Sequence, residues 1–337
     1  MGLNIKPAFR LVANSEDITA TIMERFVSLT YTDDAGVKSD SLQFTLSDHD
    51  SNNRIILPAA GAELELWLGY DNQAQRMGLF VVDEIELAGP PDTVTVKAKA
   101  APQATSSSGS GSTRLMVTTQ KTRSWDAGLT LGGMVETIAQ EHGLAPAVAV
   151  SLAPIVLPHV DQVNESDINL LTRLARDYDA IAKPAGGKLV LAKRGESKTV
   201  SGKPLPTITL VPGQVTSWRV TIAKRAKAGK VVAVWRDLNS ASDKEVAVGD
   251  GEPVRRMRHQ FTDQASAEKA ARSEYDGGQR SEGTLSISMP GDPSIIAEAR
   301  LQLSGFRSGV NGEWLVANAT HSVDKSGYRC SIRGETI

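Results

Sequence analysis

Apolar and polar residues alternate in short stretches over the first hundred residues of the chain. The stretches lie at 27–31, 42–46, 64–70, 79–85 and 94–98, and Gly, Pro, Asn or Asp residues stand between them. A period of two places every second side chain on one face of a strand. Short, evenly spaced strands with turns between them, the first turn expected at 33–36, are typical of an antiparallel barrel or sandwich. We therefore predict an N-terminal β-barrel over residues 1–103.

The same alternation returns after residue 206. It covers 208–222, 230–235 and 285–289, and an alanine-rich segment interrupts it. Thr262 or Asp263 can cap a helix there, which we expect near 262–276, ending at the glycine pair 277–278. We predict a second β-barrel over residues 206–337 that carries this helix.

The segment between the two predicted barrels, 104–205, contains a clear helical pattern. Ser166 or Asp167 can accept the first free N–H groups of a helix. Its apolar side chains then recur at steps of three and four residues, and Arg173 lies off their face. The members of this apolar face are Ile168, Leu171, Leu174, Ala175 and Tyr178. A helix of this kind packs against other elements, so we predict an α/β middle domain.

Other signals in the middle segment are local. We expect the Lys-Pro pair at 183–184 to stop the helix and the Gly pair at 186–187 to turn the chain into a strand near 189–191. An earlier helix is predicted between Thr130, as its cap, and Gly143. The tract TSSSGSGST at 105–113 has the composition of a flexible surface loop or linker.

The end of the chain resembles its beginning in five features that follow one another in the same order. The pairs are Ser39-Asp40 with Ser281-Glu282; Leu42, Phe44 and Leu46 with Leu285, Ile287 and Met289; Pro58 with Pro293, each before a strand, 62–70 and 297–306; 78–80 with 312–314; and turns at 89–92 and 324–327. A shared order of five features predicts an internal repeat. We therefore predict that the two barrels are similar and that 62–70 and 297–306 occupy corresponding places.

Several of these residues carry a resemblance to a known family. They are Ser39-Asp40 with Leu42 and Phe44; Pro58 and Gly61; Gly69-Tyr70; 80–83 and 89–91; 165–167 with Leu170, Leu171, Arg173, Leu174, Ala175 and Tyr178; and Gly312, Trp314 and His321. In this order they resemble the phage late control gene D family, the baseplate hub proteins of contractile tails. That family is related to the hub half of the valine-glycine repeat spike proteins of type VI secretion.

The resemblance implies two barrels with an α/β insertion, assembled as a homotrimer without catalytic activity. It implies a structural hub, in a contractile phage tail or tail-like particle, that joins a hexameric tail tube to a trimeric central spike. The expected partners are the spike protein, the tube protein, other baseplate subunits and the tape measure protein. Since no spike or lysozyme-like segment follows residue 337, we expect puncture and wall cleavage to reside in other chains.

Composition narrows the setting of the protein. The 337 residues carry a net charge of −2, so no overall field attracts nucleic acid or an anionic membrane. The single cysteine, Cys330, cannot form an internal disulfide, which fits a reducing compartment. Neither a signal peptide nor an apolar run of the ~20 residues needed to cross a membrane is visible. We expect synthesis in the host cytoplasm, no membrane anchor, and assembly into a tail baseplate.

A search for catalytic and metal-binding patterns predicts no catalytic, cofactor or metal site. The histidines do not stand at the spacing of metal ligands, and one cysteine cannot build a zinc site. They are His49, His142, His159, His259 and His321. Gly187-Lys188 lacks the Ser or Thr that would complete a phosphate-binding loop. Ser266 and Lys269 match a short SxxK pattern, but its companion motifs are missing, so we interpret both as a solvated helix face.

Two basic runs are candidates for nucleic-acid binding. They contain Lys224, Arg225, Lys227 and Lys230, and Arg255, Arg256, Arg258 and His259. Aromatic residues are only 5% of the chain and do not alternate with these cations, so we expect solvated loops or contacts with an acidic protein. The alternative to the hub is a tail protein that binds or hydrolyses peptidoglycan, because the predicted helix and loop at 130–143 loosely resemble the start of a LysM unit.

Overall fold

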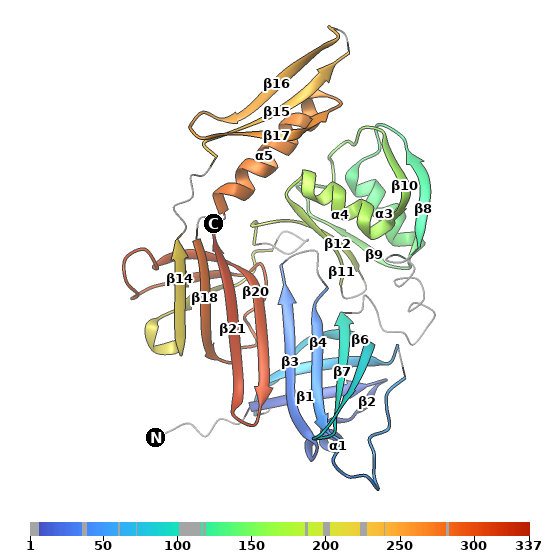
Figure 1. Ribbon diagram of the computed structural model, residues 1–337, viewed down its shortest axis with the longest axis vertical. Coiled ribbons are helices and arrows are strands. Elements are labelled where there is room, and N and C mark those ends of the chain that lie inside the picture. Colours follow the sequence, from blue (N-terminus) through green and yellow to red (C-terminus); the bar gives the residue numbers. More distant parts are fainter. Residues whose placement is uncertain are drawn as a thin grey trace.

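The computed structural model describes residues 7–35, 39–59, 61–71, 73–100, 116, 119–185, 188–197, 203–222, 228–238, 240–280 and 283–337. A large β-sheet forms one end of the molecule, a compact α/β segment lies beside it, and a helix with a narrow sheet projects at the far end (Figure 1). The prediction of a mainly β chain with a helix-containing middle segment is confirmed. The tract 105–113, the turn at 186–187, the pair 281–282 and the basic residues Lys224, Arg225 and Lys227 lie outside the described residues.

The N-terminal half contributes six main strands to the large sheet. Its elements are β1 (Pro7–Ala13), β2 (Glu16–Asp17), α1 (Thr19–Met23), β3 (Phe26–Asp34), β4 (Ser41–Ser47), β5 (Glu63–Tyr70), β6 (Gln75–Ala88) and β7 (Thr93–Ala100). The pairing order is β1-β5-β6-β7-β4-β3. The alternating apolar side chains pack into one core, with Leu11, Leu42 and Leu66 fully buried. We expected a turn at 33–36, but β3 extends to Asp34. It does so because it pairs along this length with β20, a distant strand near the end of the chain.

The C-terminal half repeats this order of strands. Its elements are β13 (Thr207–Leu210), the 3₁₀ turn η1 (Pro212–Gln214), β14 (Ser217–Ile222), β18 (Gly283–Pro290), β19 (Arg300–Leu303), β20 (Gly312–Asp324) and β21 (Gly327–Thr336). The pairing order is β13-β19-β20-β21-β18-β14. Every strand therefore has a counterpart in the first half, and the predicted repeat is confirmed in the topology. One pairing differs: β1 runs antiparallel to β5, whereas β13 runs parallel to β19.

The repeat extends to local geometry. Both β6 and β20 carry an irregularity five residues after a glycine with positive φ, between Val82 and Glu84 and between Val316 and Asn318. A left-handed residue, Gly61 or Glu298, precedes the neighbouring strand in each half. Its N–H donates to the carbonyl of Val82 or Val316 at 3.0 and 2.8 Å.

The register shows where the predicted alignment needs correction. Leu66 pairs with Gly78, and Leu303 pairs with Gly312. Leu66 therefore corresponds to Leu303, whereas the predicted alignment of 62–70 with 297–306 matches it to Leu301. The two alignments differ by two residues. A two-residue shift keeps every side chain on the same face, so alternation alone does not distinguish the two alignments.

The two halves form one continuous sheet. β3 pairs antiparallel with β20 over seven residue pairs, from Ser28 with Asp324 to Asp34 with Asn318. Among the described strands the path from β14 to β2 remains open, and no pairing closes either half on itself. The prediction of two closed barrels is therefore wrong. The edge strand of the first half, β3, pairs instead with β20 of the second half, which satisfies its backbone groups, whereas β14, the edge strand of the second half, pairs only with β18 among the described strands.

The middle segment forms a separate α/β layer. It contains β8 (Gln120–Trp125), α3 (Leu131–Glu141), β9 (Ala145–Val148), β10 (Val160–Ser166), α4 (Asp167–Asp177), β11 (Ala180–Ala185) and β12 (Lys188–Lys193). The predicted caps are confirmed: the Oγ atoms of Thr130 and Ser166 accept from the N–H groups of Gly133 and Asn169 at 3.1 and 3.4 Å. The predicted end of α4 at 183–184 is wrong, because the chain leaves the helix at Tyr178 and those residues pair in β11 with β12.

A projecting arm interrupts the C-terminal half. It consists of β15 (Lys230–Asp237), β16 (Ser242–Gly249), β17 (Val254–Phe261) and α5 (Gln264–Arg280), and it has its own small core around Val231, Ala267 and Ala271. The strand predicted at 230–235 thus belongs to a separate three-stranded sheet. α5 also runs through Gly277 and Gly278, where we expected it to end. Glycine costs a helix only about 1 kcal/mol per residue. None of the described helices combines the length and apolarity needed to cross a membrane.

Candidate functional site

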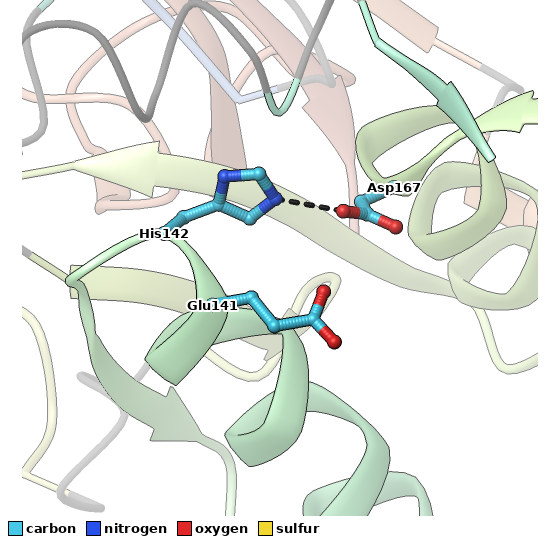
Figure 2. Close-up of side chains that lie close together, drawn as sticks. All are labelled: Glu141, His142 and Asp167. Carbon is cyan, nitrogen blue, oxygen red and sulfur yellow. Dashed lines mark hydrogen bonds and ion pairs between the residues drawn. The ribbon is translucent and has the colours of Figure 1, made fainter.

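Asp167 is the centre of a buried ionic cluster in the middle segment. It is the first residue of α4, and its side chain is 0% exposed. Lys121 and Arg123 from β8 donate to its two carboxylate oxygens at 2.6 and 2.9 Å. His142, at the end of α3, donates from Nε2 at 2.7 Å (Figure 2). The cluster therefore joins two helices and a strand through one side chain.

The surroundings of Asp167 favour its charged form. Gln162 on β10 donates to the same carboxylate at 2.9 Å. Burial works against the charge, but the hydrogen bonds from the histidine, lysine and glutamine outweigh it and lower the pKa of Asp167 from 3.8 to about 2. The position in the first turn of a helix acts in the same direction, since the N-terminal end of a helix attracts negative charge.

The same cluster contains residue types that can ligate a metal ion. Ligand atoms of Glu141, His142 and Asp167 all lie within 4.8 Å of one another, the one such group among the described residues. Lys121 and Arg123 already bridge the two carboxylates, at 2.7 and 2.5 Å from Glu141. A divalent cation would therefore meet two positive charges at the oxygens it needs. The residues fit an ion-pair network better than a metal centre.

A second, partly buried charge group lies where the middle segment meets the sheet. Lys183 on β11 donates from Nζ to Asp40 Oδ1 at 3.2 Å and to the carbonyl of Asp34 at 3.3 Å. Its Nζ lies 3.9 Å from Oδ1 of Asp33, whose other oxygen accepts from the Ala297 N–H at 2.9 Å. These contacts tie β11, β3 and the loop before β19 together. Lys183, Asp40, Asp33 and Ala297 line part of a cavity of about 540 Å³.

Electrostatics at this junction differ from those at Asp167. Burial raises the pKa of Asp40, and only part of this effect is offset by the ammonium group of Lys183. The pKa of Lys183 is also raised: burial favours its neutral form, but the carboxylates of Asp40 and Asp33 outweigh that effect. The arrangement holds the middle segment to the large sheet, and these residues place no nucleophile beside a general base.

The other candidate residues from the sequence are scattered over the structure. His49, His159 and His259 are exposed, whereas His321 is buried and donates from Nε2 to the carbonyl of Ile295 at 3.0 Å. Burial lowers the pKa of His321. Its ring stacks on Tyr31 across the β3–β20 joint, with centroids 5.6 Å apart. This histidine is a packing residue of the joint between the two halves.

The remaining candidates form ordinary structural contacts. Ser266 donates from Oγ to Asp263 at 2.7 Å at the start of α5, and Lys269 lies 5.0 Å from the ring centre of Tyr178. In the second basic run, Arg255 pairs with Glu274 at 2.7 Å and Arg256 with Glu245 at 2.5 Å. The chain thus neutralises two of these cations itself. This favours the interpretation of the run as a structural surface.

Sequence reasoning did not find the two ionic groups. In the sequence His142 is one of five scattered histidines, and Asp167 is a candidate helix cap and one of the residues that carry the family resemblance. The signal that could have pointed to the Asp167 cluster is an alternating pair of cations, Lys121 and Arg123, just before the first predicted helix of the middle segment. Neither group is a reaction centre.

Known proteins similar to this chain come from phage tails and related systems. The profile of the phage tail baseplate hub (GPD) family matches residues 39–327. A protein of Escherichia phage 186 described as a "probable baseplate hub protein" is 31% identical over 378 residues, covering 99% of this chain and 94% of the phage protein.

Solved structures share the fold at low sequence identity. The 43 kDa tail protein of prophage MuSo2 from Shewanella oneidensis superposes with a TM-score of 0.72 at 15% identity, and 98% of each chain is covered. An Escherichia coli protein described as a component of the type VI secretion system reaches a TM-score of 0.53 at 10% identity, with 93% of this chain and 74% of that protein covered. The family match spans most of the chain, and the resemblance read from the sequence is confirmed: the chain belongs to the phage tail baseplate hub family, a structural and non-enzymatic family.

Proposed function

We propose that this chain forms a homotrimeric hub that joins a sixfold tail tube to a threefold central spike in a contractile tail. The duplicated strand order is the observation that carries the proposal. Each chain contains two sets of six strands with the same pairing order. Three chains would therefore present six similar units in a ring, while the assembly keeps threefold symmetry. A ring of this kind can contact a hexamer on one side and a trimer on the other.

The proposal assigns a role to each part of the chain. The segments 1–103 and 206–337, apart from the arm, form the ring. The middle domain, 104–205, has its own core around α3 and α4 and is attached to the ring through Lys183. We assign the tube protein and the spike protein to the two faces of the ring. Other baseplate subunits and the tape measure protein are the further expected partners, and a phage or a phage-tail-like particle is the setting.

Wall hydrolysis was the other function considered from the sequence. It is not a property of a structural, non-enzymatic family. The helix that suggested a glycan-binding unit, α3, has its apolar face buried in the middle core, with Met134, Val135 and Ile138 at 0% exposure. Its packing gives no separate support to peptidoglycan binding.

Imaging of assembled tails tests the proposal. We expect three copies of this chain in one ring, with the two halves of each copy at alternating positions around the axis. Six copies in the ring, or positions of the two halves that are unrelated by a rotation about the axis, would contradict it.

A further inference from the structure

The joint between the two halves of one chain is an edge-to-edge strand pair. β20 pairs with β19 through residues 312–315 and then, on the same edge, with β3 through residues 318–324. The side chains that face the core at this joint are buried: Leu29 and Tyr31 from β3 are 1% and 3% exposed, and His321 from β20 is 0% exposed. The joint is thus a continuous part of the sheet and of its core.

The internal repeat assigns a counterpart to each strand of this joint. β6 corresponds to β20, because both pair with the following strand through the same irregularity. β14 corresponds to β3, because Val220 opposite Leu285 matches Tyr31 opposite Leu42. Two such strands, β6 and β14, would form a second joint if they met.

Within one chain these two strands do not meet. β6 pairs with β5 only through residues 75–81, so the same edge of residues 84–88 has no neighbour among the described strands. β14 pairs only with β18, and its other edge has no described neighbour. Six strands lie between β14 and β6 in the sheet order. Unpaired edges of this kind are templates for pairing with another chain.

Several side chains at the open edges are apolar and exposed. The residues that correspond to them in the intrachain joint are buried. Leu87 is 63% exposed, although its counterpart His321 is 0% exposed. On β14, Trp218 and Ile222 are 39% and 53% exposed. Their counterparts on β3 are Leu29 and Asp33, which are 1% and 8% exposed. The apolar surface that the repeat would cover is therefore left open on each copy.

We propose that residues 84–88 of β6 in one copy pair antiparallel with β14 of the next copy. The register follows from the intrachain joint: Ile85 opposite Ile222 and Leu87 opposite Val220 on the core face, Glu86 opposite Thr221 on the other. Apolar pairs directly opposite each other stabilise a sheet. Arg219, one step from Thr221 on its own face of β14, lies diagonal to Glu86 with the opposite charge. The number of copies in the ring rests on the proposed trimer, but the pairing itself does not.

Engineered disulfides in assembled tails test the register. Glu86→Cys combined with Thr221→Cys should link neighbouring copies, since directly opposed positions bring Cβ atoms within reach of a disulfide. The matched positive control is Thr32→Cys with Thr320→Cys, the same pair in the intrachain joint, which should close within one chain. The negative control is Glu86→Cys with Ser217→Cys, about 13 Å out of register at ~3.3 Å per residue. Cys330 is fully buried and its pKa is raised to about 12 by burial, so it does not compete for oxidation.

The outcomes separate the pairing from the copy number. We expect the Glu86 and Thr221 pair to convert the hub chain into a covalent species of three chains, and the out-of-register pair to leave single chains. A hub of three copies in which the intrachain control closes but the Glu86 and Thr221 pair stays unlinked would overturn the pairing. A linked species that ends at another number of chains would support the pairing and contradict the trimer.

A second pair of variants does not depend on disulfide geometry. Leu87→Lys and Ile222→Lys place a charge at the proposed joint, at side chains that are exposed in the single chain. We expect both to melt like the parent as isolated chains and to be excluded from assembled tails. Ile56→Lys, at a side chain 94% exposed and outside both edges, should assemble normally. Normal incorporation of both edge variants would contradict the proposal.

Discussion

Replacing Asp167 by asparagine should lower the stability of the middle segment by about 2–4 kcal/mol at neutral pH. A pKa lowered from 3.8 to about 2 corresponds to about 2.5 kcal/mol, at 1.36 kcal/mol per pH unit. Breaking a buried ion pair and leaving one charge behind costs about 3–5 kcal/mol. Glu141 still pairs with Lys121 and Arg123, so the loss should lie in the lower part of the combined range.

The effect has a defined dependence on pH. The pKa of Asp167 is depressed in the folded protein, so its contribution is fully present well above 3.8 and is lost as the pH falls towards 2. At pH 3 about half of the 2.5 kcal/mol remains by the same linkage relation. The difference between parent and Asp167→Asn should therefore shrink from pH 7 to pH 3.

Hydrogen–deuterium exchange of the amides in α3 and α4 measures this effect locally, because a chain with several cores need not unfold in one step. At pH 7 the variant should exchange about 30-fold to 1,000-fold faster than the parent, the equivalent of 2–4 kcal/mol. Asp161→Asn is the matched control on β10, with a side chain 57% exposed. It should change stability by no more than about 0.5 kcal/mol. Equal exchange in parent and Asp167→Asn, or a ratio that is the same at pH 7 and pH 3, would refute the electrostatic argument.

Three further predictions concern other parts of the chain. Leu171→Asp, at a side chain 1% exposed, should destabilise the middle segment by about 4 kcal/mol, whereas Arg173→Ala, at a side chain 49% exposed, should cost about 1 kcal/mol or less in chemical denaturation. Burial raises the pKa of Asp40, so its contribution to stability falls as the pH rises above 3.8. Asp40→Asn should reduce that fall, and an unchanged pH profile of melting would contradict it. The tract 105–113 should be cleaved early by a protease in the free chain, and first cleavage elsewhere in a mass-spectrometric time course would argue against a flexible loop.

The strand pattern shows how far local sequence can be interpreted. Alternation at Leu42, Phe44 and Leu46 predicted both a strand and its buried face, and all three side chains are at most 5% exposed. The cap at Ser166 likewise predicted where α4 begins. These features depend on residues within a few positions of one another. The glycine pair at 277–278 predicted the end of α5, but the helix continues to Arg280. A glycine pair weakens a helix without ending it, and the turns before this pair are held by packing on β15.

The ionic groups could not be predicted in the same way. Lys183 and Asp40 are 143 positions apart, and Ala297 and Asp33 are 264 apart. Lys183, Asp40 and Asp33 are ordinary charged residues in their own stretches of sequence, and Ala297 takes part only through its backbone N–H. Only the packing of β11 against β3 brings opposite charges together and buries them, which is also the cause of the shifted pKa values.

The sequence by itself determined the strand-rich character of this protein, the helix starts, the duplication and the family, because periodicity, capping residues and the order of motifs are written along the chain. The tertiary structure alone decided that the two halves share one sheet rather than closing as separate barrels. That choice depends on whether β3 meets β20, a pairing between strands almost 300 residues apart whose edges are equally able to pair elsewhere. Backbone hydrogen bonds are the same for every partner, so the alternation of apolar and polar residues in a strand does not specify its partner. Shape and burial at the joint, where Tyr31 stacks on His321, do.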